Sequence, residues 1–341
     1  MKSVGYTKSL AISHDDSLVD IELAQPIAAG HDVLVKITAI AVNPVDTKIR
    51  RNVTPTENEH RVLGWDAVGE IVARGDDASA FDLGDVIYYA GALNRQGCNS
   101  EYQLVDERLI ALKPKSLSAA QAAALPLTTI TAWEMLFDHL NIKQQPAGDT
   151  IRTGEIVLVV GAAGGVGSIL LQILKAITGA TIIATASRIS SQAWVRKLGA
   201  DYVIDHNNSL TPQIEALNIG QVTHVASLNG TDSYLDSYAD FMAPFGKIAT
   251  IDGSSTLDVT KLKLKCLSLH YEFMFTRSMY QTADMDEQGR LLKRVADLVD
   301  QGFIQTTIGK NLGTINANNL KAAHQELEAG TSIGKIVLEG F

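Results

Sequence analysis

The stretch from Ile156 to Arg188 constrains the fold more than any other part of this 341-residue chain. It begins with an apolar, β-branched run at 156–160, which is typical of a parallel strand covered on both faces. Six of the next seven residues, 161–167, are Gly or Ala. Apolar residues then recur at helical spacing until Gly179, and a second apolar run follows at 181–186. This order predicts a strand, a glycine-rich turn, a helix and a second strand.

A glycine-rich turn between a parallel strand and a helix leaves backbone N–H groups uncovered at the positive end of the helix dipole. Such a turn binds the pyrophosphate of a dinucleotide. The strict G-x-G-x-x-G fingerprint is not met, because Ala162 precedes Gly164 and Gly167. Alanine is acceptable there if its φ angle stays negative. The alternative is a close-packed turn in another doubly wound domain that binds nothing. We predict cofactor contacts from four residues of the turn: Ala163, Gly164, Gly165 and Val166.

The end of the second strand indicates which dinucleotide is bound. A carboxylate there would bind the ribose 2′-OH of NAD, whereas a small residue followed by Arg accommodates the 2′-phosphate of NADP. This chain has Ser187 and Arg188 there, with no acidic residue close by in the sequence. We therefore expect the cofactor to be NADPH, bound by both residues. The alternative for Arg188 is a solvated surface arginine.

Length and charge limit the class of protein. A chain of 341 residues favours two domains, and a net charge of −9 without a Lys/Arg cluster argues against a nucleic-acid surface. The one basic run, KLKLK at 261–265, alternates and predicts a strand with a lysine face.

Cys98 and Cys266 fit neither a disulfide framework nor a zinc motif. The N-terminus has no apolar leader and no run approaches about 20 apolar residues, so we expect a cytoplasmic protein without membrane partners.

The regions on either side of the glycine turn differ in pattern. Short β-type runs separated by turn residues fill 1–125 and predict a mostly antiparallel, barrel-like domain: Val33–Ile37, Ala67–Ala73, Val86–Ala90 and Glu101–Val105. Helical spacing runs from Ser118, a candidate N-cap, to Leu140. After Arg188, predicted strands and helices alternate, which indicates a doubly wound parallel sheet. The strands are at Tyr202–Asp205, Val222–Ser227 and Lys247–Ile251, and the helices include one at Ser190–Leu198 and one that starts at Asp232. Asn229 and Gly253 follow two of these strands, where cofactor contact and ordinary loop chemistry are both open.

Two late segments carry further expectations. The run from Leu267 to Phe275 alternates like a strand at the sheet edge, which predicts pairing with a second subunit in a homodimer. The alternative is that a loop or helix covers it. The tail from Gln288 returns to a helix and then a strand near Ile333–Leu338, which could complete the first domain.

Five motifs together resemble the medium-chain dehydrogenase/reductase superfamily: VNPVDTKIR at 42–50, LGWDAVGEIVARG at 63–75, ALPLTTITAWEML at 124–136, VVGAAGGVGSILLQI at 159–173 and GKIVL at 334–338. Within it, the chain is similar to the quinone oxidoreductase branch that includes zeta-crystallin, and most of all to zinc-type alcohol dehydrogenase-like proteins. The resemblance implies an α/β protein with a GroES-like β-barrel catalytic domain over 1–125, completed by 276–341. A Rossmann NADP-binding domain over 126–275 would follow, with the active site in the cleft.

The resemblance also allows a check for zinc. Zinc alcohol dehydrogenases have Cys, His and Cys at positions that here hold Asn43, Trp65 and Leu127. A catalytic zinc needs about three protein N, S or O donors, and Trp and Leu offer none. Without such a Lewis acid, the expected reaction is hydride transfer from NADPH to a quinone or α,β-unsaturated carbonyl. The alternatives are zinc-type alcohol dehydrogenase activity and a non-catalytic, crystallin-like NADPH-binding protein.

The resemblance implies that Asn43, Asp46 and Thr131 line the substrate pocket beside the nicotinamide. Quinone oxidoreductases often have Tyr where this chain has Lys48, so the lysine could instead hydrogen-bond the developing enolate. The alternative is a surface lysine in a loop. His270 and Tyr271 could reach the cleft or have structural roles.

Overall fold

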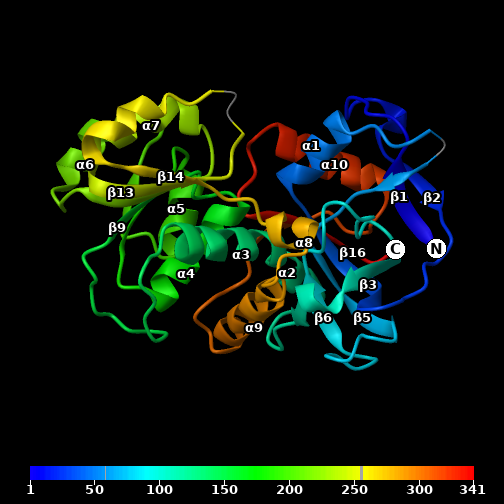
Figure 1. The fold of residues 1–341 in the computed structure, drawn as a ribbon. Coiled ribbons are helices and arrows are strands. Elements are labelled where there is room, and N and C mark those ends of the chain that lie inside the picture. Colours follow the sequence, from blue (N-terminus) through cyan, green and yellow to red (C-terminus); the bar gives the residue numbers. More distant parts are fainter. Residues whose placement is uncertain (58, 254–255) are drawn as a thin grey trace. The chain divides into compact units, whose positions relative to one another are not determined.

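The computed structural model describes residues 1–57, 59–253 and 256–341 (Figure 1). The chain forms two compact units. Unit 1 comprises Met1–Ile130, Phe275–Asp300 and Thr306–Phe341, whereas unit 2 comprises Thr131–Met274 and Gln301–Gln305. Residues 301–305 thus group with unit 2, although they lie in the segment that we assigned to the first domain.

Unit 1 is built on two sheets. The smaller one has the order β2 (Val19–Glu22), β1 (Lys2–Tyr6), β4 (Arg61–Val62). The larger one has the order β15 (Ile308–Asn311), β16 (Lys335–Glu339), β3 (Asp32–Val42), β5 (Ala67–Arg74), β6 (Val86–Tyr89), β8 (Ile110–Leu112), and β7 (Tyr102–Asp106) also pairs with β3. β16 runs antiparallel to β3, with Ile336 opposite Val42. The last strand of the chain therefore completes a sheet that the first hundred residues begin.

Helices accompany these sheets: α1 (Pro44–Asn52), α2 (Ala119–Ala123), α8 (Thr276–Tyr280), α9 (Glu287–Asp300) and α10 (Ala317–Glu328). Ser118 caps α2 as predicted, because its hydroxyl accepts the Gln121 N–H at 3.2 Å while the Gln121 side chain accepts the Ser118 N–H at 3.0 Å. Helix α3 (Pro126–Trp133) carries the chain from unit 1 into unit 2 and continues as a π-helical turn, η3 (Glu134–His139).

Unit 2 is a six-stranded parallel sheet, drawn in green to yellow in Figure 1. Its strand order is β11 (Tyr202–Ile204), β10 (Thr181–Thr185), β9 (Ile156–Val160), β12 (Val222–Ser227), β13 (Met242–Thr250), β14 (Ser268–Tyr271). The connecting helices are α4 (Gly165–Ile177), α5 (Ile189–Lys197), α6 (Leu210–Leu217) and α7 (Thr231–Phe241). All five residues of β9 are buried, as a strand covered on both faces requires. The strand order switches direction beside β9, which is where such sheets bind ligands.

Two sequence-based expectations were wrong in detail. The KLKLK run lies in a 3₁₀ helix, η4 (Val259–Lys265), and not in a strand. Asp258 starts this helix by accepting the Thr260 N–H at 3.2 Å, and within it Leu262 is buried whereas Leu264 is exposed. The late strand is also shorter than Leu267–Phe275, because β14 ends at Tyr271 and the next side chain, Glu272, turns into the protein.

None of the helices in the described part of the chain is both long and apolar enough to cross a membrane.

Candidate functional site

The glycine turn of unit 2 connects β9 to α4. Gly161 takes the left-handed conformation with φ of +77°, while Ala162 keeps a negative φ and is fully buried, so alanine fits the first fingerprint position as expected. A Cβ atom on Gly167 would lie 2.5 Å from the Ala162 Cα atom. Gly167 therefore allows the helix to pack directly against the turn.

The four residues predicted to bind the cofactor lie on the open side of this turn. Ala163, Gly164, Gly165 and Val166 are half-buried, whereas their neighbours Ala162 and Gly167 are buried. Gly164 is the N-cap of α4 and provides no side-chain cap, so the first N–H groups of the helix are not capped from there. A Cβ atom on Gly164 would meet only the Gly161 carbonyl oxygen, at 3.5 Å. These features fit a bound pyrophosphate.

Ser187 and Arg188 follow β10, the strand next to β9. Ser187 is half-buried and Arg188 is exposed at the start of α5. The Arg188 N–H donates to the Ser191 hydroxyl at 3.2 Å, and that hydroxyl donates to the Arg188 carbonyl at 2.9 Å. The backbone at Arg188 is therefore fixed by the helix start while its side chain extends to the surface.

Beyond the carboxyl ends of β12 and β13, Asn229 and Gly253 are both exposed. Asp252, which the sequence also places just beyond the end of a strand, lies beside them in a role that the sequence did not predict. The Asp252 carboxylate accepts the Thr231 N–H at 2.9 Å and the Thr250 hydroxyl at 2.7 Å. Although burial raises the pKa of Asp252, these hydrogen bonds hold it below its usual value. An ionised Asp252 thus ties together the loops that follow the two strands.

In unit 1, Asn43 and Asp46 lie together at the start of α1. The Asn43 N–H donates to the Asp46 carboxylate at 2.7 Å, which forms half of a capping box, and Pro44 is the first residue of the helix. The Asn43 amide nitrogen donates to Asp66 at 2.8 Å, and its amide oxygen accepts from the Lys335 ammonium. Asn43 is only 1% exposed. Both ends of its side chain are thus held inside unit 1.

Asp66 and Lys335 form a buried ion pair that the sequence motifs did not predict. The Lys335 Nζ atom lies 2.8 Å from one Asp66 oxygen and also donates to the Val42 carbonyl at 3.1 Å. The other Asp66 oxygen accepts the Leu127 N–H at 2.7 Å. Burial raises the pKa of Asp66, and the Lys335 ammonium and the Leu127 N–H oppose that rise. The three motifs that contain Asn43, Asp66 and Lys335 therefore meet in one polar cluster.

Asp46 is the least satisfied member of this cluster. Its Oδ1 atom has no hydrogen-bond partner among the residues that the structure describes. Burial raises the pKa of Asp46 to about 7. The Asn43 N–H and the Lys335 charge lower this pKa, but only partly offset burial, and the nearby Asp66 charge raises it further. Asp46 therefore changes its protonation state near neutral pH.

Lys48 and Thr131 are the other two predicted catalytic residues. Lys48 is exposed on helix α1 and not in a loop. Thr131 is buried in α3 at the first residue of unit 2, with 4% exposure.

The residues at the three zinc-ligand positions do not fit a metal. The Trp65 side chain is fully buried, donates its indole N–H to the Ala92 carbonyl at 3.2 Å and packs edge-on against Phe275. Leu127 has no donor side-chain atom, and the Asn43 amide is already bonded at both ends. The nearby Cys98 thiol donates to the Asp66 carbonyl at 3.3 Å, and burial raises its pKa. Within residues 1–57, 59–253 and 256–341, no group of three or more His, Cys, Asp or Glu is placed to hold a metal ion.

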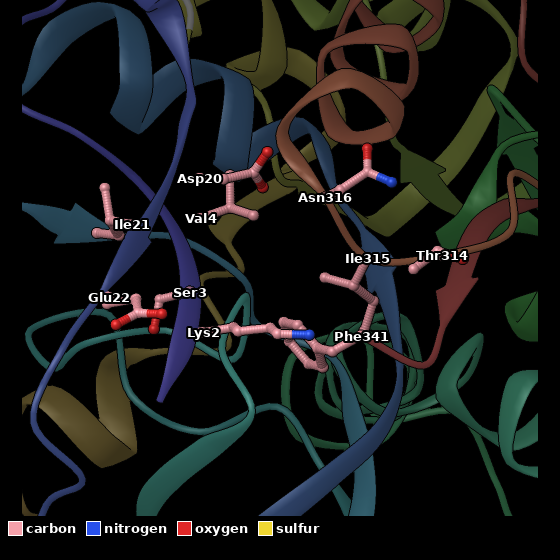
Figure 2. Close-up of a pocket in the computed structure, with 10 residues that line it drawn as sticks. All are labelled: Lys2, Ser3, Val4, Asp20, Ile21, Glu22, Thr314, Ile315, Asn316 and Phe341. Carbon is pink, nitrogen blue, oxygen red and sulfur yellow. The ribbon is translucent and has the colours of Figure 1, made fainter.

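Unit 1 also contains a surface cavity of about 360 Å³ that holds none of the predicted site residues (Figure 2). Its lining comes from β1, β2, the residues before α10 and the end of the chain. Figure 2 shows Lys2, Asp20, Glu22 and Phe341 among the lining side chains.

A doubly wound sheet with a glycine turn, together with a GroES-like domain, is the architecture of a class of oxidoreductases that use a nicotinamide dinucleotide. Residues 29–115 match the model of the alcohol dehydrogenase GroES-like domain, and residues 198–338 match that of the zinc-binding dehydrogenases. The chain is 39% identical, over 99% of both sequences, to a zinc-type alcohol dehydrogenase-like protein of Staphylococcus epidermidis. It therefore belongs to the medium-chain dehydrogenase/reductase superfamily, among the zinc-type alcohol dehydrogenase-like proteins.

One further relative and two solved structures are also similar to this chain. The human mitochondrial NAD(P)H oxidoreductase RTN4IP1 is 30% identical, over 90% of this chain and 81% of its own length. A Rhizobium etli structure, provisionally described as a zinc-dependent alcohol dehydrogenase, is 49% identical with a TM-score of 0.94 and covers 100% of this chain and 98% of its own. Escherichia coli quinone oxidoreductase complexed with NADPH shares the fold, with a TM-score of 0.83 at 23% identity and coverage of 99% and 100%.

Proposed function

We propose that this protein transfers hydride from NADPH to a quinone or an α,β-unsaturated carbonyl without a catalytic zinc. The observation that carries the proposal is the chemistry at positions 43, 65 and 127. Trp65 and Leu127 have no donor for a metal, and the Asn43 amide is bonded to Asp66 and Lys335. The zinc named in the descriptions of its relatives would therefore lack a complete set of protein ligands at these three positions.

The lack of a ligand set favours one class of substrate. Oxidation of a simple alcohol needs its alkoxide to be stabilised as hydride leaves, which zinc normally does. A conjugated acceptor needs less stabilisation of charge by a metal, because hydride adds to carbon and the negative charge spreads onto oxygen. The residues of this chain therefore suit quinones and enones better than unactivated alcohols.

The reduced nicotinamide would supply the hydride, and the residues of the chain would bind and orient the reactants. The turn residues 163–166 would hold the pyrophosphate at the start of α4, and Arg188 with Ser187 would contact the 2′-phosphate. Asn43, Asp46 and Thr131 remain the proposed pocket residues. Because Asn43 is bonded at both ends of its amide, its contribution is to fix the start of α1 and the orientation of Asp46. Lys48, exposed on α1, is the proposed contact for the oxygen of the acceptor.

Stopped-flow oxidation of NADPH tests this proposal directly. The purified protein is mixed with NADPH and a panel of quinones and enones, and NADPH binding is measured in parallel by fluorescence. We expect turnover with at least one class of conjugated acceptor. Tight NADPH binding without turnover across the panel would instead support the crystallin-like alternative, a cofactor-binding protein without catalysis.

We also propose a homodimer that forms through the edge of the unit 2 sheet. β14 is the last strand in the sheet order, and Tyr271 and Phe273 at its end are 58% and 49% exposed. The outer edge of the last strand of a sheet, with apolar side chains exposed near it, favours pairing with the same strand of a second copy. Light scattering at micromolar concentration should give the mass of a dimer, and a monomer mass would contradict the proposal.

A further inference from the structure

A second polar pair lies entirely within unit 2, and the sequence motifs did not include it. The His139 Nε2 atom is 3.0 Å from the Glu272 Oε2 atom. The Glu272 side chain is 1% exposed, whereas that of His139 is 30% exposed. A buried carboxylate that holds one nitrogen of a partly exposed imidazole is the arrangement that orients a histidine for proton transfer.

The local fold places both residues of this pair. His139 ends the π-helical turn η3, in which the next residue, Leu140, donates its N–H to the Met135 carbonyl at 3.0 Å, five residues back. Single π-helical turns occur frequently at functional sites. Glu272 is the first residue after β14, and its N–H donates to the Thr250 carbonyl at 2.8 Å. The pair therefore forms at the carboxyl end of the sheet, beside the strand that leads to Asp252, where ligands of such folds bind.

The neighbour of the pair supports a role for His139 as the proton carrier. The His270 ring stacks on the His139 ring at 5.9 Å between centroids. Burial lowers the pKa of His270, and His139 and Lys247 lower it further, so His270 stays neutral. The Nε2 atom of His139 faces Glu272. The other ring nitrogen, Nδ1, is not part of this hydrogen bond, so it is the nitrogen that would pass a proton to a substrate.

We propose that His139 is the general acid that protonates the α-carbon after hydride transfer to an enone, and that Glu272 orients it. This inference rests on the proposed function. Hydride addition to the β-carbon leaves an enolate. The Nδ1–H bond of the His139 imidazolium then breaks, its proton forms the new C–H bond at the α-carbon, and the N–H electron pair remains on the imidazole. Glu272 accepts the Nε2–H hydrogen bond throughout and so keeps the ring oriented, and a solvent proton is then taken up at Nδ1 of His139 for the next cycle.

Reduction of an α-methyl cyclohexenone in D₂O tests the role of His139, because protonation by a fixed acid creates a stereocentre on one face. The variants are His139→Gln and Glu272→Gln. The control is His14→Gln, which removes an exposed histidine 4.0 Å from a carboxylate of Asp16 in unit 1. The rate of product formation and the enantiomeric ratio at the deuterated α-carbon are measured for each protein, and circular dichroism confirms that each is folded.

The wild type and His14→Gln should give one α-enantiomer in excess. His139→Gln should lower the rate of enone reduction about 100-fold or more, the usual contribution of a positioned general acid, and should give a nearly racemic α-carbon. A folded His139→Gln variant that keeps the wild-type rate and ratio would overturn the proposal. If neither variant folds, the enantiomeric ratio of the wild-type product tests the proposal. A racemic α-carbon in that product would show protonation by solvent and would overturn the role of His139. Failure of the wild type to reduce any enone or quinone would instead refute the proposed function itself.

Discussion

Lys335 and Asp66 are 269 residues apart in the sequence, yet their charged atoms lie 2.8 Å apart and their side chains are 3% and 0% exposed. Removal of one partner would leave the other charge buried and unpaired. Lys335→Met should therefore lower the free energy of unfolding by about 3–5 kcal/mol. Denaturant unfolding followed by circular dichroism measures the change.

A double-mutant cycle separates this charge effect from a simple loss of packing. Addition of Asp66→Asn to Lys335→Met should recover part of the lost stability, because the unpaired carboxylate is gone. The matched control is Lys310→Met, which breaks an ion pair with Glu326 whose side chains are 51% and 28% exposed. That change should cost about 0–1 kcal/mol. Equal losses from the two lysine variants would contradict the role of the buried pair.

Asp46 predicts a pH dependence of stability. Its pKa is about 7 in the folded chain against an ordinary value of 3.8, so the folded state holds this proton over a range in which the unfolded state releases it. The stability contributed by protonated Asp46 is therefore fully present below about pH 4 and is lost as the pH rises through about 7. The loss amounts to roughly 4 kcal/mol at most.

The variant Asp46→Asn isolates this effect, because the amide oxygen can still accept the Asn43 N–H. The difference in unfolding free energy, wild type minus variant, should fall between about pH 4 and pH 7 and should be flat above pH 8. Denaturant unfolding at a series of pH values gives this difference. A difference that does not change with pH would show that folding does not raise the pKa of Asp46.

Arg188 predicts the choice of cofactor. A charged contact to the 2′-phosphate is typically worth about 1–3 kcal/mol, so Arg188→Ala should raise the dissociation constant of NADPH roughly tenfold or more. The dissociation constant of NADH should stay nearly unchanged, because NADH lacks this phosphate. Arg196→Ala, which removes an exposed arginine from the far end of the same helix, is the control. Fluorescence titration of both cofactors measures the dissociation constants. If Arg188→Ala weakened the binding of NADPH and NADH equally, Arg188 would not contact the 2′-phosphate.

Two glycines of the turn should respond differently to the same substitution. A Cβ atom on Gly167 would lie 2.5 Å from the Ala162 Cα atom, so Gly167→Ala should destabilise unit 2. A Cβ atom on Gly164 has room in the protein, so Gly164→Ala should keep the wild-type melting temperature but weaken NADPH binding. Thermal melts and NADPH titrations of the two variants test this contrast. Wild-type affinity in Gly164→Ala would argue against a phosphate at this turn.

Elements whose pattern is local could be predicted from the sequence. β12 has the predicted bounds Val222–Ser227, and β9 lies at Ile156–Val160, because uninterrupted apolar runs specify buried strands. The prediction of a strand for the KLKLK run was wrong, because alternation over five residues fits a strand and a 3₁₀ helix equally well. Here the Asp258 cap and the buried Leu262 favour the helix.

The polar contacts of the candidate site could be predicted only in part. Asn43 and Asp46 lie within one motif, so their proximity follows from the start of α1. The partners Asp66 and Lys335 lie in two other motifs, and only the pairing of β16 with β3 brings Lys335 beside Val42. The His139–Glu272 pair depends on a π-helical turn, which has no clear sequence pattern.

The most direct test of the whole account is a measurement of metal content together with activity. The purified protein is analysed for zinc by mass spectrometry, dialysed against a chelator and assayed for NADPH oxidation with an enone and for NADP⁺ reduction with ethanol. We expect no stoichiometric zinc, unchanged enone reduction after chelation and little oxidation of ethanol, because Trp65 and Leu127 replace two of the three ligands. One zinc per chain together with chelator-sensitive ethanol oxidation would contradict the account.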